Sequence, residues 1–202
     1  MEPPSRVLLA SANPKKAGEL AEVLRTVWPD VELVPRPDHV PDVVEDAFDF
    51  VGNARLKAVA LADATGEVSL ADDSGLEVDA LGGAPGVRSA RYAGDAANDA
   101  DNVALLLSEL ARLGAVTAEQ RRARFRCTVV LRWPDGAEVV ADGVVEGTII
   151  DSPRGDHGFG YDPVFVPDDR DESTFAEMSS VDKHEISHRG RALRSLADQL
   201  VG

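Results

Sequence analysis

The chain has 202 residues, 44% of them hydrophobic and 28% charged, and its formal net charge is −15. That length can bury a substantial core in a single domain. The acidic balance argues against a nucleic acid polymer as partner, because such polymers are held mainly by basic surfaces. A small phosphate ligand needs only a few converging basic side chains and a divalent metal.

Apolar runs in the chain are all shorter than the roughly 20 residues of a membrane helix, and the first residues lack the basic-then-apolar pattern of a signal peptide. The single cysteine, Cys127, excludes an intramolecular disulfide and argues against a cysteine-based zinc site. We therefore expect a cytoplasmic enzyme or binding protein with no membrane partner.

The N-terminal half predicts strands that alternate with helices. Asn13 can cap the first helix, Pro14 suits its first turn and Gly66 ends the second helix. Apolar runs and helical spacing predict the following elements in chain order: strand Val7–Ser11, a helix after Asn13, strand Val31–Val34, helix Phe50–Ala64 and strand Val68–Ala71.

The C-terminal half adds a hairpin. Its predicted elements are helix Asp99–Leu113, strands Arg124–Trp133 and Glu138–Gly147 around the turn Pro134-Asp135-Gly136, strand Pro163–Val166 and a helix from about His188. The whole pattern predicts an α/β (mixed α+β) fold with a mixed twisted sheet flanked by helices. We expect one domain over residues 1–202, in which the hairpin forms a second lobe beside a central cleft.

Two adjacent carboxylates, Asp72 and Asp73, follow the strand predicted at residues 68–71 and lead into Ser74 and Gly75. Paired acids at the end of a strand are typical of a site that holds a hard cation beside a phosphate. The same residue types dominate turns, so the segment taken alone favours a plain turn.

Basic side chains gather at the first strand-to-helix junction. A helix N-terminus presents N–H groups and a positive dipole end to a phosphate. Here Ser11 and Asn13 add donors, and Lys15 and Lys16 add charge. Taken alone, the junction is better explained as a capped helix with solvated lysines. The glycine motifs of P-loop and dinucleotide folds are absent from the sequence.

Glu45 and Lys57 each allow two interpretations. Glu45 lies in an acidic loop before the second helix, where the helix dipole also favours a solvated acid. Lys57 lies near Asn53 on a largely apolar face of that helix. It is either a lysine that extends its ammonium to water or a buried phosphate ligand, and periodicity does not decide.

Two late segments could recognise a nucleoside. Gly158–Pro163 lets backbone approach a ligand and offers aromatic rings for stacking on a base, or it forms an ordinary loop with core aromatics. Lys183–Arg189 is either a polar recognition surface or a charged helix start. His184 and His188 are four residues apart, but the sequence has no H-E-x-x-H motif, so a metal pair is poorly supported.

Taken together, these segments resemble the inosine triphosphate pyrophosphatase family, in order and over nearly the whole chain. The matching segments are residues 8–16 (LLASANPKK), 53–58 (NARLKA), 71–94, 123–127 (ARFRC), 158–165 (GFGYDPVF) and 187–193 (SHRGRAL). The resemblance implies an elongated mixed sheet split into two lobes and a homodimer. It also implies magnesium-dependent hydrolysis of deaminated purine nucleoside triphosphates (ITP, dITP and XTP) to the monophosphate and pyrophosphate.

The same resemblance assigns roles to single residues. Asp73, Lys16 and Lys57 would be catalytic, and Glu45, Asp73 and Asp72 would hold Mg²⁺. The residues that would bind the substrate are Ser11, Ala12, Asn13, Pro14, Lys15, Lys16, Ser74, Phe159, Gly160, Tyr161, Asp162, Lys183, His188 and Arg189.

The chain departs from the family pattern at four places: Gly52, where an acidic residue commonly precedes Asn53, the stretch 47–49, Ala12 and His157. Two other functions stay open. One is a pyrophosphatase for other modified bases, against which the segments Asp-Asp-Ser-Gly and Ser-His-Arg-Gly argue. The other is a nucleotide-binding module without turnover, against which the intact Asp72, Asp73 and Lys16 argue.

Overall fold

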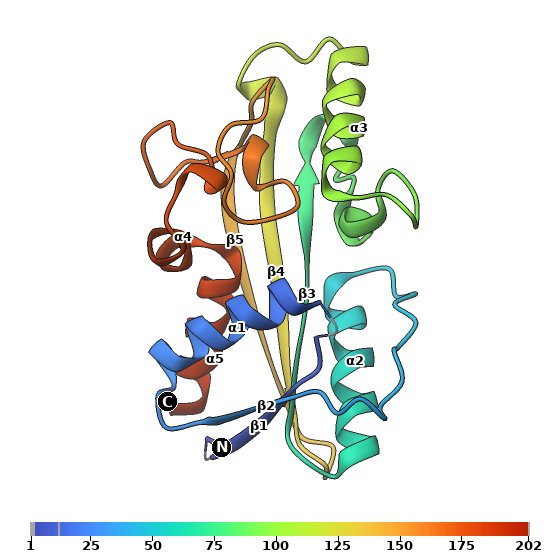
Figure 1. Cartoon of the computed structure of the whole chain (residues 1–202), viewed down its shortest axis with the longest axis vertical. Coiled ribbons are helices and arrows are strands. Elements are labelled where there is room, and N and C mark those ends of the chain that lie inside the picture. The colour runs from blue at the N-terminus through green and yellow to red at the C-terminus, as the bar shows by residue number, and fades with distance from the viewer. Residues whose placement is uncertain (1–2, 12, 202) are drawn as a thin grey trace. The chain divides into compact units, whose positions relative to one another are not determined.

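The structure is a computed structural model that describes residues 3–11 and 13–201, and Figure 1 shows its ribbon. The strands and α-helices are β1 (Arg6–Leu9), α1 (Pro14–Val27), β2 (Glu32–Pro35), α2 (Phe50–Thr65), β3 (Ser69–Val78), α3 (Asp99–Arg112), β4 (Arg122–Arg132), β5 (Glu138–Ile149), β6 (Phe165–Pro167), α4 (Ser180–Ile186) and α5 (His188–Val201). Within those described residues, every helix is too short or too polar to span a lipid bilayer.

The six strands form one mixed sheet in the order β2-β1-β3-β4-β5-β6. Strand β1 pairs parallel with β2 and with β3, whereas β6 pairs antiparallel with β5. The predicted α/β class with a mixed twisted sheet flanked by helices is therefore confirmed.

The chain divides into two compact units. Unit 1 comprises Met1–Asp73, Cys127–Gly143 and His188–Gly202, and unit 2 comprises Ser74–Arg126 and Val144–Ser187. The predicted turn of the hairpin is present, because the N–H of Trp133 donates to the carbonyl of Ala137. The turn lies in unit 1, however, so the prediction that the hairpin forms a second lobe by itself is wrong. The two hairpin strands are long enough to contribute to both units.

Unit 1 has helices on both faces of its part of the sheet. Alternate residues of a strand point to opposite faces, and Val7, Leu9 and Leu70 pack in one apolar cluster with side chains of α1 and α5. Leu8 and Ala71, their neighbours in sequence, pack in a second cluster with α2. Helices α1 and α5 also contact each other, as Figure 1 shows. Each face of the strands therefore meets a different set of helices.

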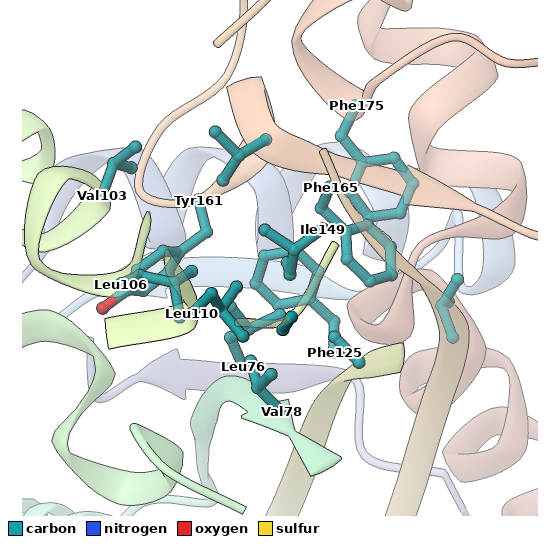
Figure 2. Close-up of a cluster of buried hydrophobic side chains, with 14 of the residues drawn as sticks. Leu76, Val78, Val103, Leu106, Leu110, Phe125, Ile149, Tyr161, Phe165 and Phe175 are labelled. Atoms are coloured by element: carbon teal, nitrogen blue, oxygen red, sulfur yellow. The ribbon is translucent and has the colours of Figure 1, made fainter. Parts of the chain in front are cut away.

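Unit 2 has its own core, which Figure 2 shows. Its members come from the distal half of β3, from α3, from β4 and β5, and from the segment that contains β6. Three aromatic rings, Phe125, Phe165 and Phe175, lie with their centroids 4.8 to 5.8 Å apart. Such ring contacts stabilise a core beyond the area that they bury.

Strand β3 is longer than predicted. It runs from Ser69 to Val78 without a break, so Asp72, Asp73 and Ser74 lie inside a strand and not in a turn. The sequence suggested a turn because Asp, Ser and Gly dominate turns. Strand β3 lies between β1 and β4 in the sheet, and pairing on both sides overrides the local preference.

Candidate active site

Asp72 and Asp73 point to opposite faces of the sheet. Because they are consecutive residues of β3, Asp72 lies on the same face as Leu70, which packs with α1 and α5. Asp73 lies on the same face as Ala71, which packs with α2. Both are almost fully buried, with relative exposures of 2% and 4%. The two carboxylates that resemble a pair in the sequence therefore have separate surroundings.

Asp73 faces polar side chains of α2. Its Oδ2 accepts a hydrogen bond from Nδ2 of Asn53 at 3.0 Å, and its Oδ1 lies 3.9 Å from Nζ of Lys57. The same ammonium lies 3.2 Å from Oε2 of Glu45. Asn53 and Lys57 are one helical turn apart on the same face, so α2 presents both groups to Asp73. The structure thus gathers Asp73, Lys57 and Glu45, as the sequence predicts.

Burial and charge oppose each other at Asp73. Burial raises the pKa of Asp73 above its usual value, although Lys57 and Lys16 act to lower it. A carboxylate with a raised pKa is a stronger base, which suits the deprotonation of a water molecule near neutral pH.

Asp72 lies in a charged cluster on the other face. Its Oδ2 accepts from Nε and Nη2 of Arg189 at 3.4 and 3.3 Å, and Nη1 of Arg189 pairs with Glu19 of α1. Burial alone would raise the pKa of Asp72, but the charges of Lys16, Arg189 and Lys57 outweigh it and hold the pKa below its usual value. Asp72 therefore stays ionised and pairs with α5.

The first strand-to-helix junction has the predicted cap. Oδ1 of Asn13 accepts from the N–H groups of Lys15 and Lys16 at 3.0 and 3.4 Å, and the Ser11 hydroxyl donates to the carbonyl of Asn13 at 3.3 Å. Pro14 opens α1. Ala12, which we also predict to bind substrate, lies outside the described residues. The charge of Lys16 acts on both Asp72 and Asp73, so this junction belongs to the same region of unit 1.

Unit 2 gathers the late segment that the sequence singles out. Nζ of Lys183 in α4 lies 2.7 Å from Oδ2 of Asp162, which also accepts from the N–H of Phe159 at 2.8 Å. The same ammonium lies 5.2 Å from the centroid of the Phe159 ring, a cation–π contact. Gly158 lets this turn form, since it has a φ of 75° and an added Cβ would meet Asp162 Oδ2 at 2.1 Å. A buried ion pair thus fixes an aromatic ring.

Two further contacts hold this loop. The N–H of Gly160 donates to Asp99 at 2.9 Å, and the Tyr161 hydroxyl donates to the carbonyl of Ser89 at 2.9 Å. Ser74, at the start of the unit 2 part of β3, is partly buried. His188 and Arg189 begin α5 in unit 1 and not in unit 2. His184 lies in α4, so the two histidines do not share one helix.

The carboxylates of Glu45 and Asp73 fit a magnesium ion by their donor chemistry. Both lie near one positive charge, that of Lys57, and oxygen donors suit Mg²⁺, which keeps several water ligands and needs only one or two carboxylates. Across the described part of the chain, no three His, Cys, Asp or Glu side chains gather closely enough to hold a metal by themselves. Asp72 points to the other face, so the metal set that the sequence predicts is not assembled from all three acids.

Two residues that contact the candidate site residues have no role in the sequence prediction. Asn53 is fully buried beside Asp73, and Glu19 pairs with Arg189. The spacing of Asn53 and Lys57, one turn apart on α2, was a usable signal. Nothing in the sequence marks Glu19, because its partner is 170 residues away.

Comparison with known proteins gives one consistent result. A family model described as the Ham1 family matches residues 7–199. A protein of Lactobacillus acidophilus named dITP/XTP pyrophosphatase is 47% identical over 195 residues, which cover 95% of each chain. A Bacillus subtilis protein of the same name is 42% identical over 193 residues, 96% of each chain.

A solved structure has the same fold. The structure of a HAM1 protein from Coxiella burnetii matches with a TM-score of 0.86 and 40% sequence identity, over 97% of this chain and 98% of that one.

Proposed function

The chain belongs to the Ham1 family, and from this premise we propose that it hydrolyses deaminated purine nucleoside triphosphates to the nucleoside monophosphate and pyrophosphate. Relatives that match nearly its full length are named dITP/XTP pyrophosphatase. The observation that carries the proposal is the buried Asp73 carboxylate beside Lys57 and Glu45.

Unit 1 supplies the hydrolytic groups. Asp73 accepts a proton from a water molecule while the water oxygen bonds to phosphorus and the bond to the bridging oxygen breaks, so that pyrophosphate leaves. Lys16 and Lys57 neutralise phosphate charge, and Ser11, Asn13 and Lys15 bind the triphosphate. Glu45 and Asp73 would hold Mg²⁺, which would supply further neutralisation of the phosphate charge. Asp72 keeps Arg189 and the start of α5 in place, which supports the site without the direct metal contact that the sequence predicts.

Unit 2 supplies recognition of the nucleoside. Phe159 offers a ring for stacking, and Lys183 offers a donor for the 6-oxo group that inosine and xanthosine present where adenine has an amino donor. A buried donor that faces a donor is costly, so adenine is rejected. Tyr161 and Asp162 hold the loop that carries Phe159. His188 and Arg189 stay assigned to the nucleoside by resemblance.

Three further parts of the proposal come from the resemblance. The metal is Mg²⁺, the chain forms a homodimer, and the protein acts in the cytoplasm on the nucleotide pool. Light scattering of the purified protein tests the dimer, and a mass of about 21.5 kDa in solution would contradict it.

One assay separates this function from its alternatives. Purified protein is incubated with Mg²⁺ and ITP, XTP, dITP, ATP, GTP or dUTP, and pyrophosphate and orthophosphate are measured separately. We expect pyrophosphate from the inosine and xanthosine substrates alone. Release of orthophosphate would refute the proposal, turnover of dUTP would favour other modified bases, and binding without turnover would favour a nucleotide-binding module.

A further inference from the structure

We propose that Asn53 is a positioning residue of the active site, whose carboxamide holds Asp73 and the loop that carries Glu45 in one arrangement. The inference rests on the proposed function and extends it to a residue with no assigned role. Asn53 has a relative exposure of 0% and lies in the first turn of α2.

The contacts of Asn53 reach one predicted metal ligand, Asp73, and the loop that carries the other, Glu45. Nδ2 donates to Oδ2 of Asp73 at 3.0 Å, and Oδ1 accepts from the N–H of Ala47 at 3.0 Å. Ala47 is two residues after Glu45 in the chain. One side chain therefore links the carboxylate at the centre of the sheet to the loop on which the second carboxylate lies.

The orientation of the carboxamide is fixed by its partners. A backbone N–H can only donate, so the oxygen of Asn53 has to face Ala47, and the amide nitrogen then faces the carboxylate. The hydrogen bond occupies one oxygen of Asp73 and leaves the other directed toward Lys57. Loss of this bond would free the carboxylate to rotate.

Gly52 explains how the loop comes this close. An added Cβ at Gly52 would meet the Cβ of Ala47 at 2.6 Å and Oδ1 of Asp49 at 2.8 Å. The glycine thus makes room for Ala47 against the start of α2. The space left at Gly52 therefore allows the hydrogen bond from the N–H of Ala47 to Oδ1 of Asn53.

The test is the nearly isosteric variant Asn53→Asp. It keeps an acceptor for Ala47 but places an acceptor against Asp73, so the link to the carboxylate is lost. We expect kcat for ITP to fall and the dissociation constant for Mg²⁺ to rise, each by about 10- to 100-fold, as for other residues that orient metal ligands, with KM less affected. Mg²⁺ affinity is measured by calorimetry with the metal alone, in the absence of nucleotide.

Unit 2 offers a matched control in Asn102. It is also buried, its Oδ1 accepts from the N–H of Ala93 at 2.8 Å, and its Nδ2 donates to the carbonyl of Ala90 at 3.2 Å. Asn102→Asp breaks an equivalent bond to backbone and should lower Tm while leaving kcat and Mg²⁺ affinity unchanged. Equal losses of kcat in both variants would mean that Asn53 acts only through stability and would overturn the inference.

The double variant N53D/D73N, which exchanges the two side chains, tests the inference if Asn53→Asp alone does not fold. It restores an amide that donates to a carboxylate at this place, so we expect its Tm to recover while turnover stays absent. An unfolded N53D that the second change does not rescue would overturn the inference, as would a folded N53D with normal kcat and Mg²⁺ affinity. Failure of the wild type to release pyrophosphate would instead refute the proposed function.

Discussion

Asp72 and Asp73 are adjacent, but the structure gives their charges opposite consequences. Asp72 is surrounded by basic groups that hold its pKa below the usual value, whereas burial raises the pKa of Asp73. A depressed carboxyl pKa stabilises the fold at neutral pH, and a raised one destabilises it. The pair therefore separates a residue that stabilises the protein from one that we propose serves the reaction.

Asp73→Asn should abolish turnover and leave Tm at pH 7.5 equal to or higher than that of the wild type. The amide removes the base and also removes a buried charge that the fold holds at a cost. Pyrophosphate release and calorimetric unfolding measure the two effects. Near-normal turnover would contradict the role of Asp73 as base.

Asp72→Asn should act mainly on stability. It removes one of the two carboxylates that pair with the buried guanidinium of Arg189, since Glu19 remains, and loss of one member of a buried ion pair costs up to about 3–5 kcal/mol. Denaturant unfolding measures this loss, and Asp198→Asn on the exposed side of α5 serves as a control for removal of an acid. An unchanged free energy of unfolding would show that the contact with Arg189 contributes nothing.

At the scale of elements, one glycine in β5 allows α5 to pack close to the sheet. A Cβ on Gly143 of β5 would meet the carbonyl oxygen of His188 at 2.1 Å and the amide nitrogen of Ala192 at 2.4 Å. Both are backbone atoms of the first turns of α5, so the helix itself would have to move. That turn carries His188 and Arg189.

Gly143→Ala should therefore lower Tm, because overpacking of this kind costs about 1–3 kcal/mol, and should also raise KM for ITP. Gly18→Ala is the matched control on α1, where an added Cβ meets nothing within 4 Å. This second change should stabilise the protein by about 0.5–1 kcal/mol, since alanine is the better helix former. Thermal unfolding of both variants checks the contrast, which equal Tm values would disprove.

At the scale of the whole molecule, the net charge of −15 and the buried acids set the response to pH. The stabilisation from Asp72 is fully present above its unfolded pKa of about 3.9 and is lost as the pH falls through its lower folded pKa. The destabilisation from Asp73 has the opposite sign and disappears as the pH falls through its raised folded pKa.

Two comparisons of Tm against pH follow. The difference between the wild type and Asp72→Asn should stay constant from pH 7 to about 5 and shrink below about pH 4. The increase in Tm that Asp73→Asn causes should instead begin to shrink at a higher pH. Scanning calorimetry from pH 3.5 to 7.5 measures both differences in Tm. If both differences shrink over the same pH range, the pKa values of the two carboxyls are not shifted in opposite directions.

The sequence predicted the order and type of the main elements because their apolar spacing is strong. The helices that begin at Pro14, Phe50 and Asp99 start where their caps and spacing place them. It failed at β3, where pairing on both sides overrode a turn-like segment, and for the hairpin, whose strands contribute to both units. Such features depend on neighbours that lie far away in the chain.

The sequence by itself singled out the residues that we propose carry the chemistry, since the order of its acids, lysines and aromatic loops resembles that of one family. Only the tertiary structure decided what each one touches. Strand alternation sends Asp72 to Arg189 and Asp73 to Asn53, Lys57 and Glu45. Two residues that are neighbours in the chain come to differ in pKa because a strand turns consecutive side chains to opposite faces, where different helices meet them.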